Sequence, residues 1–251
     1  MKLLETKIIA HRGASKYAPE NTMPAFKLAY QLKSEGIETD VQLTKDNIPV
    51  LIHDEHVKRT TNGTGYIKEL SFEQLRQLDA GSWHSKEFAG TQLISLEEFL
   101  QWIADKPLYL NIELKNNKID YKHLESIVYE MVEYYQLLNR TTLSTFNPRS
   151  VSRLKSFNKE IGVAFLTSKR NKNLVSYAYE LGANAIHIKY RLLNQLLIDQ
   201  CKKKDMAVRI YTINRSAQMS KCFKHETTGI FTDVPDKALN YRTNFHQSRQ
   251  G

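Results

Sequence analysis

Short β-rich segments alternate with longer amphipathic segments along the whole chain, and this alternation limits the fold more than any other feature. It is the pattern expected of repeated βα units, which form a parallel sheet. The predicted strands cover residues 8–11, 37–40, 108–114, 141–146, 161–166, 185–188, 207–213 and 229–233. Eight such units in a chain of 251 residues match the usual size of an α/β barrel. The sequence therefore predicts one domain over residues 1–251, a single (β/α)8 TIM barrel.

Two segments depart from the simple unit. Residues 49–53 form a further strand-like run, which follows the second strand after the polar link 44–47. Because a parallel crossover needs a dozen or more residues, this run is expected to fold back as an antiparallel hairpin at the barrel mouth. Residues 55–92 are rich in loop-forming residues and predict a small insertion with a short helix around 72–78, which we expect to face the substrate.

The two ends of the chain and its overall charge allow further predictions. Residues 241–251 are polar and predict a frayed tail. No apolar run approaches the roughly 18 residues of a membrane helix, and the amino terminus leaves no room for a signal peptide, so we expect a cytoplasmic protein without a transmembrane segment. The net charge of +9 favours anionic partners. The basic residues are scattered and lack interleaved aromatic residues, which argues against nucleic acid. No sequence feature indicates an oligomeric state.

Acidic side chains gather where predicted strands end. Glu38 and Asp40 lie two residues apart in one strand, so both point to the same face, and Glu113 with Lys115 repeats that spacing on the next barrel strand. Carboxylates inside a barrel are unfavourable unless they are paired or bind a cation. Oxygen ligands of this kind suit a hard divalent metal, Mg²⁺ or Ca²⁺.

Two histidines end neighbouring segments at the same edge. His11 and Arg12 close the first strand, and His53 closes the hairpin, so an acid and a base become available beside the carboxylates. Three carboxylates with Arg12 and Lys115 carry a net charge of −1, which repels an anionic substrate. A divalent cation changes this charge to +1. Barrel enzymes keep their sites at this end of their strands, which favours a catalytic interpretation of the whole set.

These residues also stand in motifs, and together the motifs resemble those of the glycerophosphodiester phosphodiesterase family. The similar segments run through residues 7–240 and are His11-Arg12-Gly13, Ala18-Pro19-Glu20-Asn21-Thr22, 38–46, His53-Asp54, 59–65, 79–83, 111–115, 211–214 and 229–235. The resemblance implies a TIM barrel and a divalent metal held by Glu38, Asp40 and Glu113. It also implies acid–base catalysis by His11 and His53, and phosphate contacts from Arg12 and Lys115. The implied substrates are deacylated phospholipid headgroups, cleaved to sn-glycerol 3-phosphate and an alcohol.

Several alternatives stay open at this stage. The family usually has tryptophan where this chain has Tyr211, which could alter the wall of the headgroup pocket. The order of the two histidine roles is undetermined, with His11 as base and His53 as acid as the working assignment. The nucleophile is either water or the neighbouring glycerol hydroxyl, the latter giving a cyclic phosphate. A lysophospholipase D-type activity on lysophospholipids and a non-catalytic binder of glycerophosphodiesters are the competing functions.

Overall fold

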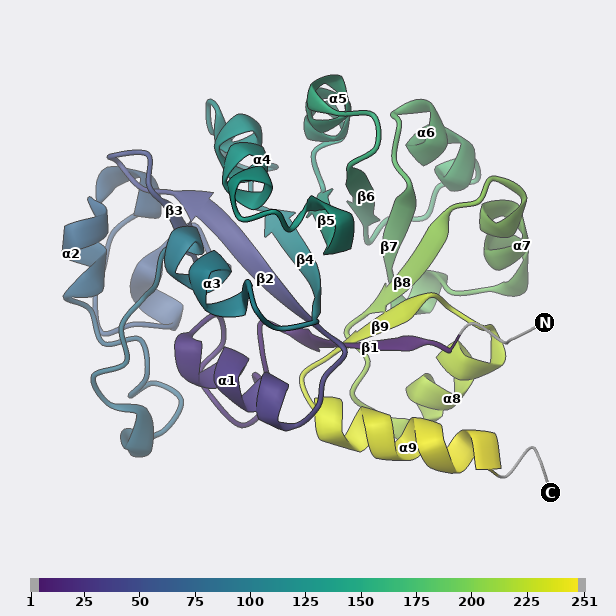
Figure 1. Cartoon of the computed structure of the whole chain (residues 1–251), viewed down its shortest axis with the longest axis horizontal. Helices are drawn as coiled ribbons and strands as arrows, with labels where there is room; N and C mark the ends of the chain where they lie inside the picture. Colours follow the sequence, from purple (N-terminus) through teal and green to yellow (C-terminus); the bar gives the residue numbers. More distant parts are fainter. Residues whose placement is uncertain (1–4, 248–251) are drawn as a thin grey trace.

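The computed structural model describes residues 5–247, and eight parallel strands form a closed barrel at its centre (Figure 1). These strands are β1 Lys7–His11, β2 Gly36–Leu43, β4 Tyr109–Leu114, β5 Thr141–Thr145, β6 Gly162–Thr167, β7 Ala185–Lys189, β8 Ala207–Tyr211 and β9 Gly229–Thr232. Each strand pairs with the next one along the chain, and β9 pairs with β1 to close the ring. The predicted α/β class, the TIM barrel and all eight strands are therefore confirmed.

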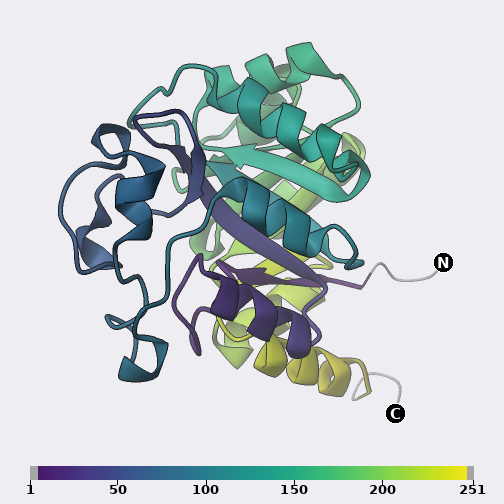
Figure 2. The same ribbon diagram turned by 60° about the vertical axis from the view of Figure 1, so that its left-hand side comes forward.

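One helix follows each barrel strand and covers its outer face (Figures 1 and 2). These helices are α1 Met23–Gln31, α3 Leu96–Ile103, α4 Leu124–Tyr134, α5 Pro148–Phe157, α6 Leu174–Glu180, α7 Gln195–Lys203, α8 Ser216–Lys224 and α9 Pro235–Gln247. Helix α1 begins after Thr22, with Pro24 in its first turn, where a missing N–H does no harm. No helix within residues 5–247 is long and apolar enough to cross a membrane.

The two faces of each strand have different roles. On β2, Ile37 and Val41 belong to the large hydrophobic core between barrel and helices, while Glu38 and Asp40 alternate with them and point into the barrel. All eight residues of β2 are nevertheless buried. The core between strands and helices supplies the apolar burial, which leaves the barrel interior free to hold polar side chains.

The predicted hairpin is confirmed, because β3 (Pro49–Leu51) pairs antiparallel with the end of β2. Residues 55–92 then form the insertion, with three short 3₁₀ helices and α2 (Phe72–Arg76), which begins in a capping box between Ser71 and Gln74. The insertion has a small core of its own, built around the buried residues Val57, Ile67 and Leu75.

The predicted frayed tail is wrong for residues 241–247, which belong to α9, and residues 248–251 lie outside the described part. The buried Arg242 side chain ties this helix to the barrel. Its Nη1 and Nη2 lie 2.7 and 3.0 Å from the two carboxylate oxygens of Glu35, and Nη1 also donates to the Thr6 carbonyl. Tyr241 and Phe245 pack against Phe223 of α8. The polar composition of this segment does not indicate these long-range contacts, which is why the sequence predicted a frayed tail.

Candidate active site

The three predicted carboxylates meet at one point of the barrel mouth. Glu38 and Asp40 come from β2 and Glu113 from β4, and the strand register places Asp40 opposite Glu113. One oxygen of each carboxylate lies within 4.8 Å of the others. Glu38 and Asp40 are fully buried behind the mouth, so these charges are held close together away from bulk water.

The buried carboxylates of this acidic cluster repel one another, and the pKa of Glu38 shows the effect. Burial and the neighbouring charge of Asp40 raise the pKa of Glu38 well above its ordinary value. Burial also acts to raise the pKa of Asp40, but the charges of Arg12 and Lys115 outweigh it and lower that pKa. The Oδ1 atom of Asp40 is buried and accepts no hydrogen bond. A buried carboxylate oxygen without a donor, beside two further acids, fits a hard divalent cation.

Lys115 and Arg12 surround the acidic cluster with positive charge. The Nζ atom of Lys115 lies 2.7 Å from Oε1 of Glu113 and 3.7 Å from Oδ1 of Asp40. Burial disfavours the ammonium, yet Glu113 and Asp40 more than offset this effect and raise the pKa of Lys115. Arg12 donates its backbone N–H to Oε2 of Glu38 at 2.8 Å, and its Nε lies 3.2 Å from Oδ2 of Asp40.

The turn after β1 sets the position of Arg12. Arg12 and Gly13 both adopt left-handed backbone angles, with φ of +57° and +82°. A Cβ atom on Gly13 would lie 2.7 Å from the carbonyl carbon of Ala25, so only glycine permits this close approach to α1. The turn thereby points the Arg12 N–H at Glu38.

Each predicted catalytic histidine is held by a carboxylate. The Nδ1 atom of His11 lies 2.7 Å from Oδ1 of Asp233, and Nδ1 of His53 lies 2.6 Å from Oδ1 of Asp54. Burial opposes ionisation of both aspartates, but hydrogen bonds and nearby positive charge lower the pKa of each to about 2. Because ionised carboxylates only accept, Nδ1 of each ring must donate, and Nε2 is left as the nitrogen that can exchange a proton with a ligand.

An ion-pair network connects the insertion to Arg12 and to the partner of His53. Glu20 accepts from Arg12 Nη1 at 2.8 Å and from both terminal nitrogens of Arg59, at 2.9 and 2.7 Å. Arg59, in the 3₁₀ helix Val57–Arg59, also donates from Nε to Oδ2 of Asp54 at 2.7 Å. The insertion therefore supports the partner of His53 directly and contacts Arg12 through Glu20.

Seven of the eight predicted site residues line one pocket of about 380 Å³ at the barrel mouth. They are His11, Arg12, Glu38, His53, Glu113, Lys115 and Tyr211. The eighth, Asp40, belongs to the acidic cluster beside them. The volume is within the range of small-molecule sites. Tyr211 forms part of the wall, with its ring 6.3 Å from that of Phe146 in an edge-on arrangement.

Sequence reasoning missed some members of this site. Asp54 and Asp233 appeared in the motifs without a role, although Asp233 directly follows the last strand and so had to reach the same rim. Lys189, at the end of β7, lines the pocket, and so does the fully buried His187 two residues earlier. His187 lies 3.2 Å from Arg209 through its Nε2, and burial together with that charge lowers its pKa. The same two-residue spacing that identified Glu38 and Asp40 could have identified His187 and Lys189.

Comparison with known proteins gives a consistent result. The model of the glycerophosphoryl diester phosphodiesterase family matches residues 11–237. A glycerophosphodiester phosphodiesterase of Caldanaerobacter subterraneus is 36% identical over 237 residues, covering 94% of this chain and 98% of that protein. One from Bacillus altitudinis is 34% identical over 240 residues, covering 94% and 98%. Among solved structures, an Oleispira antarctica phosphodiesterase in complex with the product sn-glycerol 3-phosphate has a TM-score of 0.86 and 29% identity, covering 94% of this chain and 96% of that one.

Proposed function

Because this chain belongs to the glycerophosphoryl diester phosphodiesterase family, we propose that it hydrolyses glycerophosphodiesters to sn-glycerol 3-phosphate and an alcohol with the help of a divalent metal. The observation that carries the proposal is the shared pocket, in which the acidic cluster and two carboxylate-held histidines face the same space. The product bound to the Oleispira antarctica phosphodiesterase supports glycerol 3-phosphate as the product here.

Glu38, Asp40 and Glu113 would hold the metal, since their oxygens converge and Asp40 Oδ1 has no other donor. A bound Mg²⁺ or Ca²⁺ would supply positive charge to the phosphate oxygens and polarise the phosphorus for attack. Without that charge the acidic cluster, counted with Arg12 and Lys115, has no net positive charge to attract an anionic substrate, whether Glu38 is ionised or protonated. Substrate binding and metal binding are therefore expected to be coupled.

His11 is assigned as general base and His53 as general acid for the leaving alcohol. Asp233 and Asp54 each hold Nδ1, so that Nε2 of both rings is available to the substrate. The reverse assignment uses the same contacts, and the pH dependence of single variants distinguishes the two. Arg12 and Lys115 stabilise the charge that builds on the phosphoryl oxygens.

The attacking group is either water or the free hydroxyl of the glycerol next to the ester. Attack by water gives inversion at phosphorus in one step and incorporates one solvent oxygen. Attack by the glycerol hydroxyl gives a cyclic glycerophosphate, which a second step opens. Trapping the cyclic product, or tracing solvent ¹⁸O together with the stereochemistry, separates the two routes.

The proposal is tested with a coupled assay for glycerol 3-phosphate release. Glycerophosphocholine, glycerophosphoethanolamine and glycerophosphoglycerol are compared after chelation, with Mg²⁺ or Ca²⁺ added back separately. Metal-restored release from at least one of them is expected, and release that persists unchanged in excess chelator contradicts the metal requirement. Lysophosphatidylcholine serves as the competing substrate. We expect poor turnover of it, because the insertion buries its aliphatic residues Val57, Ile67 and Leu75 in its own core.

A further inference from the structure

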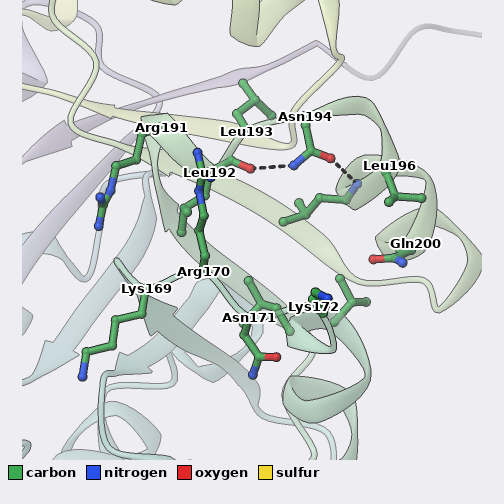
Figure 3. Close-up of a pocket in the computed structure, with 13 residues that line it drawn as sticks. Lys169, Arg170, Asn171, Lys172, Arg191, Leu192, Leu193, Asn194, Leu196 and Gln200 are labelled. Atoms are coloured by element: carbon green, nitrogen blue, oxygen red, sulfur yellow. Dashed lines mark hydrogen bonds between the residues drawn. The ribbon is translucent and has the colours of Figure 1, made fainter.

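A second hollow lies on the rim of the barrel, beside the candidate active site. It has a volume of about 460 Å³ and lies between the loops that follow β6 and β7 and the starts of α6 and α7 (Figure 3). Both loops leave the carboxyl ends of their strands, which is the edge of the barrel where the candidate active site lies. We call this hollow the rim groove.

The rim groove is strongly basic. Its lining contains four cationic side chains and no acidic one: Lys169, Arg170, Lys172 and Arg191. All four are exposed, and none forms an ion pair within residues 5–247. By contrast, most of the other basic residues at the mouth form ion pairs. Arg12, Arg59 and Lys115 are each paired with a carboxylate. The rim groove therefore presents positive charge that the protein itself does not balance.

The same groove also has an apolar component. Leu192, Leu193 and Leu197 line it as buried side chains, while Leu196 is 66% exposed on the first turn of α7. Asn194 caps this helix, donating to the Leu192 carbonyl and accepting from the Leu197 N–H, which fixes the direction in which α7 starts (Figure 3). A large exposed aliphatic side chain next to unpaired cations is the combination found at interfacial membrane contacts.

The rim groove and the catalytic pocket are lined by neighbouring parts of the chain. Lys189 lines that pocket, and Arg191, two residues further on, lines the groove. Arg191 is also close enough to Tyr211 for its charge to oppose the rise in the tyrosine pKa that burial and Glu113 cause. The insertion lies on the other side of the molecule, away from α6 and α7 (Figure 1). A surface that contacts the groove would therefore meet the mouth without covering the insertion.

We propose that the rim groove docks the protein on the surface of a bilayer that contains anionic phospholipids, with Leu196 inserted among the headgroups and the four cations against the lipid phosphates. Charge complementarity favours an anionic partner, and the exposed leucine favours a lipid surface over a polar polyanion. No aromatic residue lines the groove in the described part of the chain, which disfavours single-stranded RNA, where bases stack on aromatic rings. Docking in this way brings the catalytic mouth to the source of lipid-derived headgroups.

Sedimentation with vesicles tests the proposal. Vesicles of phosphatidylcholine alone are compared with vesicles containing phosphatidylglycerol, and binding to the second kind only is expected. The triple variant Lys169→Ser, Arg170→Ser, Lys172→Ser should weaken that binding by at least about tenfold, because each basic residue near an anionic surface typically contributes roughly fivefold. The single variant Leu196→Ser should weaken it without any change of charge.

The matched control removes the same number of charges elsewhere. Lys202, Lys203 and Lys204 lie at the far end of α7, and their triple serine variant should sediment like the unaltered protein. Turnover of dissolved glycerophosphocholine should be unchanged in all three variants, so a failure of docking is distinct from a failure of the proposed reaction. No sedimentation with phosphatidylglycerol, equal losses in both triple variants, or tight RNA binding unaffected by Leu196→Ser would each overturn the proposal.

Discussion

His11 and Asp233 are 222 positions apart in the sequence, yet Nδ1 of the histidine lies 2.7 Å from Oδ1 of the aspartate. The contact exists because β9 pairs with β1 and closes the barrel, with Ala10 beside Thr232. Ser15 and Asn214 also donate to the Asp233 carboxylate, which fixes it against the ring. The closure of the barrel therefore orients one of the two histidines proposed for catalysis.

Asp233→Asn should lower kcat/KM by roughly 10²- to 10⁴-fold, because the amide no longer requires His11 to carry its proton on Nδ1. Steady-state turnover of glycerophosphocholine measures the loss, and its pH profile should change shape. Asp236→Asn is the matched control on α9, where the aspartate accepts from the Tyr17 hydroxyl and not from a histidine. Similar losses in both variants would point to a general effect on folding.

Chelation should lower thermal stability as well as activity. A divalent ion that binds the folded acidic cluster stabilises the fold by about 2.7 kcal/mol when its concentration is a hundred times the dissociation constant. The melting temperature of the chelated protein should therefore rise on addition of Mg²⁺ or Ca²⁺. Glu113→Gln should lose most of this rise, whereas a variant distant from the cluster, such as Glu98→Gln on α3, should keep it.

Metal affinity should increase with pH because of Glu38. Burial and the charge of Asp40 raise its pKa well above the ordinary value, which favours the neutral form in the folded, metal-free protein. Stability from that form is fully present below the unfolded pKa and is lost as pH rises through the folded one. Metal must displace this proton, and calorimetric titration should show tighter binding as pH rises through the raised pKa of Glu38. A pH-independent affinity in the unaltered protein would contradict this account, while Glu38→Gln should flatten the dependence and weaken binding.

Arg59→Ala should lower kcat/KM by about tenfold, although the residue lies in the insertion and does not line the candidate active-site pocket. Its removal leaves Glu20 and Asp54 without their shared cation, so that Arg12 and His53 lose part of their support. Arg76→Ala provides the control, since Arg76 belongs to the same insertion but pairs with Glu98. Equal turnover in the two variants would show that the Glu20–Arg59–Asp54 network is not needed.

Tyr211→Phe should change headgroup preference more than stability. The Tyr211 hydroxyl is buried without a hydrogen-bond partner, so its removal should alter the free energy of unfolding by no more than about 1 kcal/mol. Since the ring lines the pocket, KM for glycerophosphocholine relative to glycerophosphoethanolamine should shift while kcat changes little. Chemical denaturation and the headgroup panel measure the two effects. A stability loss of several kcal/mol would indicate a hydrogen bond that the hydroxyl makes in solution.

Local sequence patterns were enough to predict the barrel, the hairpin and the convergence of the acidic and basic side chains at one rim, namely Glu38, Asp40, Glu113, Lys115, His11 and His53. These features depend on the alternation of strands and helices and on the side-chain period of a strand, both of which are local properties of the chain. The helix over residues 241–247 was not predicted, because its polar composition does not reveal that Arg242 binds Glu35, which is 207 positions away in the sequence.

The partners of the side chains in the candidate active site follow from tertiary contacts and not from local patterns. His11 with Asp233, Glu20 with Arg59 and His187 with Arg209 are contacts between segments that meet when strands register and the ring closes. The unpaired positive charge of the rim groove also depends on tertiary structure, because folding decides which basic side chains lie close to a carboxylate. Local patterns place residues at an edge, but the partner of each one is set by packing over the whole chain.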